Sequence, residues 1–141
     1  MPVLHVSVTS PLPPQAVLQR LTDFGPARAA KWAGVDNHNL IVHDEGDGWA
    51  EVTEGNKLRW ERERYTWDAS AGSVSAVTLK SNVWAPGSGW NYTIMPEGTG
   101  SRVEVTAVRK GYGVKGKLMG ALLSLLGKRV ITSSTTAALA T

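Results

Sequence analysis

The stretch RVEVTAVRKGYGVKGKLMGALLSLLGKRVI, residues 102–131, holds the last strand and the start of the longest helix that the sequence predicts. Residues 102–109 alternate between apolar and polar side chains, which is the period of a half-buried strand. Glycines at 111, 113 and 116 then break the pattern and predict a flexible joint. Residues 117–140 follow as one long helix. Its predicted apolar face consists of Leu118, Leu122, Leu125, Leu126, Val130 and Ile131.

The residues before this stretch predict one strand, two short helices and then a series of hairpins. Residues 3–9 alternate as a strand, Pro13 and Pro14 open a helix that ends before Gly25, and residues 27–33 form a second helix. The remaining strands are predicted at residues 40–43, 49–53, 58–67, 74–79 and 90–95. Because these strands follow one another without intervening helices, we expect an antiparallel sheet.

The predicted fold class is α+β, with a curved sheet of about seven strands wrapped around the long C-terminal helix in one domain, residues 1–141. So wide a sheet twists and curls, and a single helix does not fill its concave side. The chain has six Trp and three Tyr but one Phe. Rings that combine apolar area with a polar group suit the wall of a pocket. The alternative is that these rings simply fill the core.

Composition excludes several classes of protein. The chain has no cysteine, which rules out disulfides and cysteine-based metal or nucleophile sites. Its three histidines lack the spacing of a metal site, so we expect neither a metal nor a cofactor. No signal-peptide pattern and no apolar run long enough to span a bilayer is present, and a cytoplasmic location is the expectation.

The net charge is +3 and the sequence pI is near 9.4. The last third of the chain holds a cluster of basic residues, namely Arg109, Lys110, Lys115, Lys117, Lys128 and Arg129. Such a cluster can bind anionic lipid, nucleic acid or an acidic ligand, or it can be a solvated helix end. No aromatic and basic stripe accompanies it, so we expect no nucleic-acid partner. Peripheral contact with a membrane through this basic, leucine-rich segment stays as a hypothesis.

Two segments and the order of elements resemble a known family. Residues 60–64 read WERER, and residues 81–90 read SNVWAPGSGW, with the pattern Asn-x-x-x-Pro-Gly-Ser-x-Trp. Together with GKLMG at residues 116–120, they resemble the SRPBCC superfamily, also called START-like or pollen-allergen-like, and within it the actinobacterial polyketide cyclase/dehydrase and lipid transport group. The resemblance implies a helix-grip fold with a cavity between sheet and C-terminal helix. It also implies binding of lipids, sterols, polyketides or plant hormones, and in some members cyclisation of aromatic polyketides.

The strand predicted at residues 58–67 supplies the candidate polar groups. If Trp60 faces inward, Arg62 and Arg64 share that face and can clamp a carboxylate or a polarised carbonyl. The alternative is an exposed cross-strand ladder of Arg and Glu. The full set of predicted pocket residues is Trp32, Trp60, Arg62, Arg64, Trp84, Trp90, Tyr92, Leu118 and Leu122.

The sequence therefore predicts a protein that binds or carries a hydrophobic small molecule, either a lipid or a polyketide-like compound. One alternative is a polyketide cyclase or dehydratase, in which His38 or His43 acts as a general base beside an arginine clamp. All three histidines, His5 included, are more typical of surface positions. A second alternative is a membrane-surface or protein-interaction module built on the basic C-terminal helix.

Overall fold

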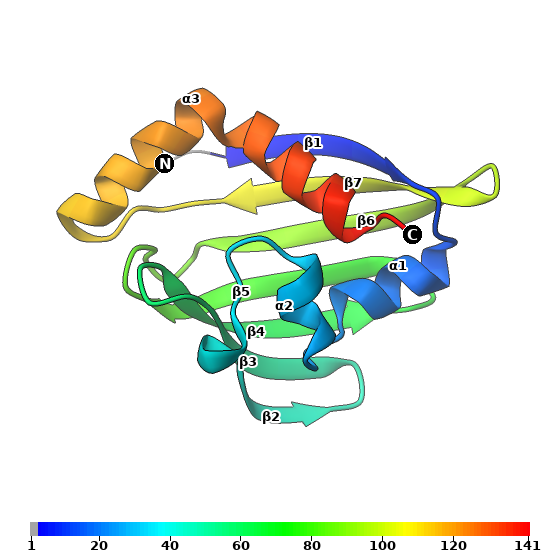
Figure 1. Ribbon diagram of the computed structural model, residues 1–141, viewed down its shortest axis with the longest axis horizontal. Coiled ribbons are helices and arrows are strands. Elements are labelled where there is room, and N and C mark those ends of the chain that lie inside the picture. The colour runs from blue at the N-terminus through cyan, green and yellow to red at the C-terminus, as the bar shows by residue number, and fades with distance from the viewer. Residues whose placement is uncertain (1–2) are drawn as a thin grey trace.

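The computed structural model describes residues 3–141, and within that range the chain forms a seven-stranded sheet with one long helix lying over β1 (Figure 1). Neighbouring strands are antiparallel, in the order β1-β7-β6-β5-β4-β3-β2. The strands are β1 (Val3–Ser10), β2 (Ile41–Gly46), β3 (Trp49–Gly55), β4 (Trp60–Asp68), β5 (Ser73–Ser81), β6 (Gly89–Glu97) and β7 (Gly100–Val108). The predicted fold class is confirmed.

The helices are α1 (Pro14–Leu21), α2 (Ala27–Lys31) and α3 (Gly113–Ala138), with a short 3-10 helix, η1 (Asn37–Asn39), before β2. The sequence pattern did not predict η1, in which the Asp36 side chain accepts a hydrogen bond from the backbone N–H of Asn39. The last helix begins at Gly113 rather than at residue 117. Its first turn closes because the N–H of Gly116 donates to the carbonyl of Tyr112 at 3.0 Å, so this segment is helix and not a flexible joint.

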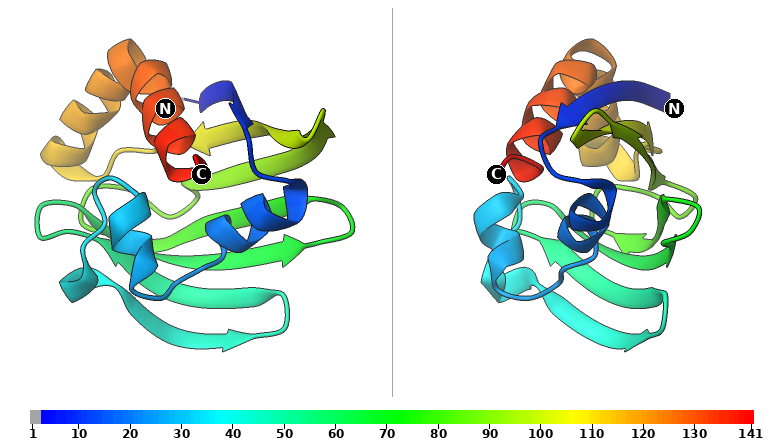
Figure 2. Two further views of the ribbon diagram at one scale, coloured as in Figure 1. Left: turned by 45° about the vertical axis from the view of Figure 1, so that its right-hand side comes forward. Right: turned by 90° about the vertical axis from the view of Figure 1, so that its right-hand side faces the viewer.

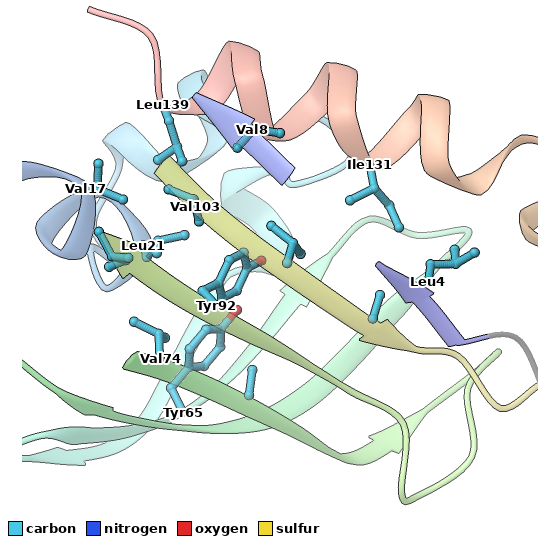
Figure 3. Close-up of a cluster of buried hydrophobic side chains, with 14 of the residues drawn as sticks. Leu4, Val8, Val17, Leu21, Tyr65, Val74, Tyr92, Val103, Ile131 and Leu139 are labelled. Carbon is cyan, nitrogen blue, oxygen red and sulfur yellow. The ribbon is translucent and has the colours of Figure 1, made fainter. Parts of the chain in front are cut away.

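The core lies between the concave face of the sheet, α1 and the second half of α3 (Figures 2 and 3). Alternate strand residues point into it, as the two-residue period of a strand requires. Val52, Val103 and Val17 have no exposed surface at all. Burial of each such side chain contributes about 1.5–3 kcal/mol to folding. Tyr65 and Tyr92 extend from the same face of the sheet, with their hydroxyl groups toward the helix side (Figure 3).

Helix α3 approaches the rest of the molecule through glycines. A Cβ at Gly116 would overlap with the backbone carbonyl of Val83, and one at Gly127 would lie 2.6 Å from Leu4 Cδ1. The large side chains therefore point away. The prediction of a buried leucine face was wrong. Ile131 is buried, but the other residues of the predicted face are more than half exposed, namely Leu118, Leu122, Leu125, Leu126 and Val130.

The C-terminal end of α3 is anchored to α1 and β1. The Arg20 guanidinium donates to the carbonyl oxygens of Ala138 and Ala140, at 2.6 and 3.0 Å. The Ser10 hydroxyl donates to the carbonyl of Leu139 at 2.6 Å. These bonds satisfy carbonyls that the end of a helix leaves without partners. None of the helices in residues 3–141 has the length and apolar character needed to cross a membrane.

Candidate functional site

A cavity of about 260 Å³ lies between the sheet and α3. Its wall includes residues of β3, β4 and β6, the segment that follows α2, and the middle of α3. The volume is slightly below the range of pockets that hold drug-sized ligands, which starts at about 300 Å³. The space therefore suits a compact small molecule.

Aromatic rings form much of the cavity wall. The structure places five of the predicted pocket residues there, namely Trp32, Trp60, Trp84, Trp90 and Tyr92. They come from the end of α2, the start of β4, the segment between β5 and β6, and β6 itself, so the fold brings together rings that are far apart in the sequence. Whether they bind a ligand stays a prediction.

A buried ion pair lies at one side of the cavity. The Arg28 guanidinium donates to both carboxylate oxygens of Glu54, at 3.0 and 3.3 Å, and to the hydroxyl of Tyr65 at 3.0 Å. The Tyr65 hydroxyl in turn donates to Glu54 at 2.5 Å. Burial opposes ionisation of Glu54, but the charge and hydrogen bonds of Arg28 outweigh it and lower the pKa of this carboxyl. Glu54 is therefore a carboxylate, held in a fork geometry that only arginine provides.

A second arginine, Arg109, lies at the other side with 2% of its surface exposed. It donates to Glu61 at 3.0 Å and to the Thr78 hydroxyl at 3.3 Å. Its guanidinium carbon is 5.1 Å from the ring centre of Trp84 and 4.8 Å from that of Trp90, within reach of cation–π attraction. Arg109 is thus part of the cavity wall. Of the interpretations of the basic cluster, the solvated helix end does not apply to Arg109, because a carboxylate and two indoles replace the solvent.

Glu63 lies two residues after Glu61 on β4, and its side chain is buried. No residue among 3–141 donates a hydrogen bond to its Oε2 atom. Burial, followed by the negative charges of Glu61 and Glu54, raises the pKa of Glu63 well above its ordinary value. Glu63 therefore keeps its proton to a higher pH than an ordinary glutamate does. Two arginines of the cavity wall are paired with carboxylates, Arg28 with Glu54 and Arg109 with Glu61, and a third, the exposed Arg59, also borders the cavity.

Arg62 and Arg64 do not line the cavity, which corrects the predicted arginine clamp. Arg62 pairs with Glu51 at 2.6 Å on the outer face of the sheet, and Arg64 lies over the Trp49 ring at 4.4 Å from its centre. Their side chains are 40% and 47% exposed. The physical reason is the register of β4, since it is the odd-numbered residues from Glu61 to Tyr65 that point inward. The alternative of an exposed Arg and Glu ladder describes this face correctly for Arg62 and Glu51.

Leu118 and Leu122 do not line the cavity either. They are 64% and 55% exposed, because glycines occupy the packing side of α3. Leu123 is the leucine of this part of the helix that faces the cavity. One residue along a helix turns a side chain by about 100°, enough to move it from the outer side to the inner one.

The histidines lie outside the cavity. His5 shares a hydrogen bond with Thr106 at 2.9 Å, His43 shares one with Thr53 at 2.7 Å, and both are exposed, as is His38. Within residues 3–141, no cluster of three or more His, Asp or Glu side chains has the arrangement of a metal site.

The sequence interpretation missed nine polar side chains of the cavity wall, namely Arg28, Glu54, Arg59, Glu61, Glu63, Tyr65, Arg109, Ser134 and Thr135. The sequence did contain a signal for the inward glutamates of β3 and β4. Val52 and Ala50 are apolar residues of β3, and Glu54 continues their alternation. Tyr65 likewise fixes the inward parity of β4, which includes Glu63. The signal was passed over because charged residues are almost never fully buried unless they are paired.

Comparisons with solved structures identify the fold, whereas no model of a known protein family and no curated protein matches this sequence. A protein from Thermus thermophilus superposes with a TM-score of 0.74 at 17% identity, over 98% of this chain and 92% of that one. A START superfamily protein from Mycobacterium smegmatis gives 0.69 at 12% identity, over 91% of this chain and 93% of the other. This chain has the START-like helix-grip fold.

A third similar structure is the Zhui aromatase/cyclase of a Streptomyces species, with a TM-score of 0.73 at 11% identity over 97% of this chain and 91% of that one. The resemblance to SRPBCC and START-like proteins is therefore confirmed for the fold. Identities this low carry neither a ligand nor an activity, because one fold serves many functions.

Proposed function

We propose that this helix-grip protein binds and carries an apolar small molecule, lipid-like or polyketide-like in character, in the cavity beneath α3. The observation that carries the proposal is the cavity itself, a space of about 260 Å³ bordered by four tryptophans and two tyrosines. Aromatic walls with a few fixed polar groups are the usual composition of a small-molecule site. The START-like and aromatase/cyclase structures that share the fold support a ligand of this class.

The charge of the cavity wall narrows the ligand class. Arg28 and Arg109 each already hold a carboxylate, so neither is a free cation that awaits an anionic group. An anionic group deep in the cavity would have to separate one of these buried pairs, and breaking such a pair is costly. A neutral ligand with hydroxyl or carbonyl oxygens leaves both pairs in place. We therefore favour a ligand whose enclosed body is uncharged, compact and partly aromatic; an acidic group on it would lie at the exposed Arg59.

The enzymatic alternative is cyclisation or dehydration of a polyketide. The residues that the sequence analysis assigned to this chemistry do not line the cavity. Arg62, Arg64, His38 and His43 all lie outside the cavity wall. A cyclase needs a base and an electrophilic clamp within hydrogen-bond reach of one point. The remaining acid and base candidates are carboxyls already engaged with arginines or with each other, which fits binding better than catalysis.

The test combines an unbiased measurement with a blocking variant. Native mass spectrometry of protein purified without detergent should show a bound small molecule that denaturation releases. Titration with the uncharged dye Nile red should then compare Ser134→Phe with Ser133→Phe. Ser134 lines the cavity, whereas its neighbour Ser133 is exposed and does not, so the second variant is the matched control.

We expect Ser134→Phe to weaken dye binding by about tenfold or more, since a phenyl ring occupies much of a cavity this small, and Ser133→Phe to bind as the unmodified chain does. Equal binding by the two variants would place the dye elsewhere. No copurified molecule, together with no rise in melting temperature from any neutral lipid or aromatic ketone, would rule out the carrier function.

A further inference from the structure

The first half of α3 exposes a row of large apolar side chains. Val114 is 80% exposed, Leu118 64%, Leu122 55% and Leu125 81%. Spacings of four, four and three residues place them on one face of the helix, opposite the glycines that pack inward. This part of the helix lies at the periphery of the molecule (Figures 1 and 2). An apolar row of this kind on a protein surface marks an interaction site.

The surroundings of this row are basic. Helix α3 contains Lys115, Lys117, Lys128 and Arg129 and, from Gly113 to Ala138, no acidic residue. The loop between β3 and β4 adds Lys57 and Arg59, which flank Leu58, itself 74% exposed.

The loop and the helix are joined directly. The Lys115 ammonium group donates to the backbone carbonyl of Leu58, which holds the loop against the first turns of α3. We call the resulting surface the docking face. It consists of the apolar residues Leu58, Val114, Leu118, Leu122 and Leu125 and the basic residues Lys57, Arg59, Lys115 and Lys117.

The same two elements form part of the cavity wall. Arg59 lies in the loop and Leu123 in the helix, and both line the cavity. Val130, which follows Leu123 by seven residues on the same helix, lines it as well. A ligand that passes between loop and helix would therefore enter or leave beside the docking face.

We propose that the docking face binds the surface of an anionic lipid bilayer, with α3 lying in the interface and its leucines inserted among the acyl chains. An apolar helix face bordered by lysines and arginines is the composition of helices that bind membranes in this way. Juxtaposed basic residues add attraction to anionic headgroups. A second copy of the chain fits less well, because it would bring the lysines and arginines of both copies together. The inference does not depend on which molecule occupies the cavity.

The experiment is cosedimentation of the full chain with phosphatidylcholine vesicles, with and without one third phosphatidylglycerol, at low salt. Three double variants are compared with the unmodified chain. Leu118→Ser with Leu125→Ser removes apolar side chains, and Lys57→Gln with Lys117→Gln removes charge. Arg64→Gln with Arg102→Gln removes the same charge from the outer face of the sheet and is the matched control. Circular dichroism and melting temperature confirm that each variant folds.

We expect binding to the anionic vesicles and little to phosphatidylcholine alone. The lysine variant should bind about 30-fold more weakly and the leucine variant at least tenfold more weakly, while the control stays within about twofold after the same loss of net charge. The proposal is overturned if anionic vesicles leave the chain in the supernatant, or if the control loses as much binding as the lysine variant. It is also overturned if light scattering shows a stable dimer that the leucine variant converts to monomer, since the face would then be a subunit interface.

Discussion

Replacing Glu63 with Gln should make the protein more stable at neutral pH, by an amount that grows as the pH rises. In the folded state the pKa of Glu63 lies well above the ordinary value of 4.5, first because of burial and then because of the charges of Glu61 and Glu54. Between these two pKa values, the unfolded chain has lost the proton and the folded chain keeps it. The contribution of Glu63 to the free energy of unfolding is therefore fully present below about pH 4.5. Between the two pKa values it falls by about 1.4 kcal/mol for each pH unit. An amide has nearly the same shape as the protonated acid and cannot ionise.

The measurement is urea unfolding of both proteins at a series of pH values from about 4.5 upward. The free energies of unfolding should differ little at the lowest pH, and the difference in favour of Glu63→Gln should rise by about 1.4 kcal/mol per unit until the folded pKa is passed. The pH of that plateau gives the folded pKa itself. Glu104→Gln is the control for the same change of side chain at a site on the outer face, where Glu104 is 42% exposed. A difference that stays constant with pH would refute the raised pKa of Glu63.

The buried ion pair and the glycine packing of α3 give two further predictions. Arg28→Met should lower the free energy of unfolding by about 3–5 kcal/mol, because it leaves Glu54 buried and charged. Arg28→Met combined with Glu54→Gln should recover much of that loss. Urea unfolding measures both variants, and additive effects of the two substitutions would contradict the pairing. Gly116→Ala should cost about 1–3 kcal/mol because the new methyl group meets the carbonyl of Val83, which is backbone and cannot turn aside. Gly127→Ala should cost less, since it meets the flexible end of a leucine and gains helix propensity. Melting temperatures rank the two, and the reverse order would show that α3 packs differently.

The order of elements along the chain, the hairpin series and the terminal helix were predictable from alternation and turn residues alone. The position of β4 along the chain was predictable in the same way. The side of the sheet to which each of its side chains points was not. Pattern analysis puts apolar residues inside and charged residues outside, and by that rule Trp60 predicts inward Arg62 and Arg64. The strand instead places Glu61 and Glu63 inside, because Arg28 and Arg109 arrive from α2 and from the end of β7 to pair with buried carboxylates. These partners are distant in sequence, and no local pattern reveals them.

The prediction of the buried face of α3 was wrong for a related reason. Leucines at helical spacing predict a buried face when packing is assumed to use the largest side chains. Here Gly116 and Gly127 let the backbone come close to its neighbours, and a close approach leaves no room for leucines on that side. The sequence shows both stripes, one of glycines and one of leucines. Choosing between them requires the distance between helix and sheet, which is a tertiary quantity.

The two errors together explain why a cavity persists in so small a protein. A helix that packed its leucines inward would have filled the space under α3 with side chains that make many favourable contacts. Because the leucines face outward, that space is bordered instead by rings and by the pairs Arg28–Glu54 and Arg109–Glu61. Each pair must remain intact, since removing either partner would leave an unpaired charge in a medium of low dielectric constant. The walls are therefore held in position by their own electrostatics, and collapse of the cavity would require either the helix to rotate or a pair to separate.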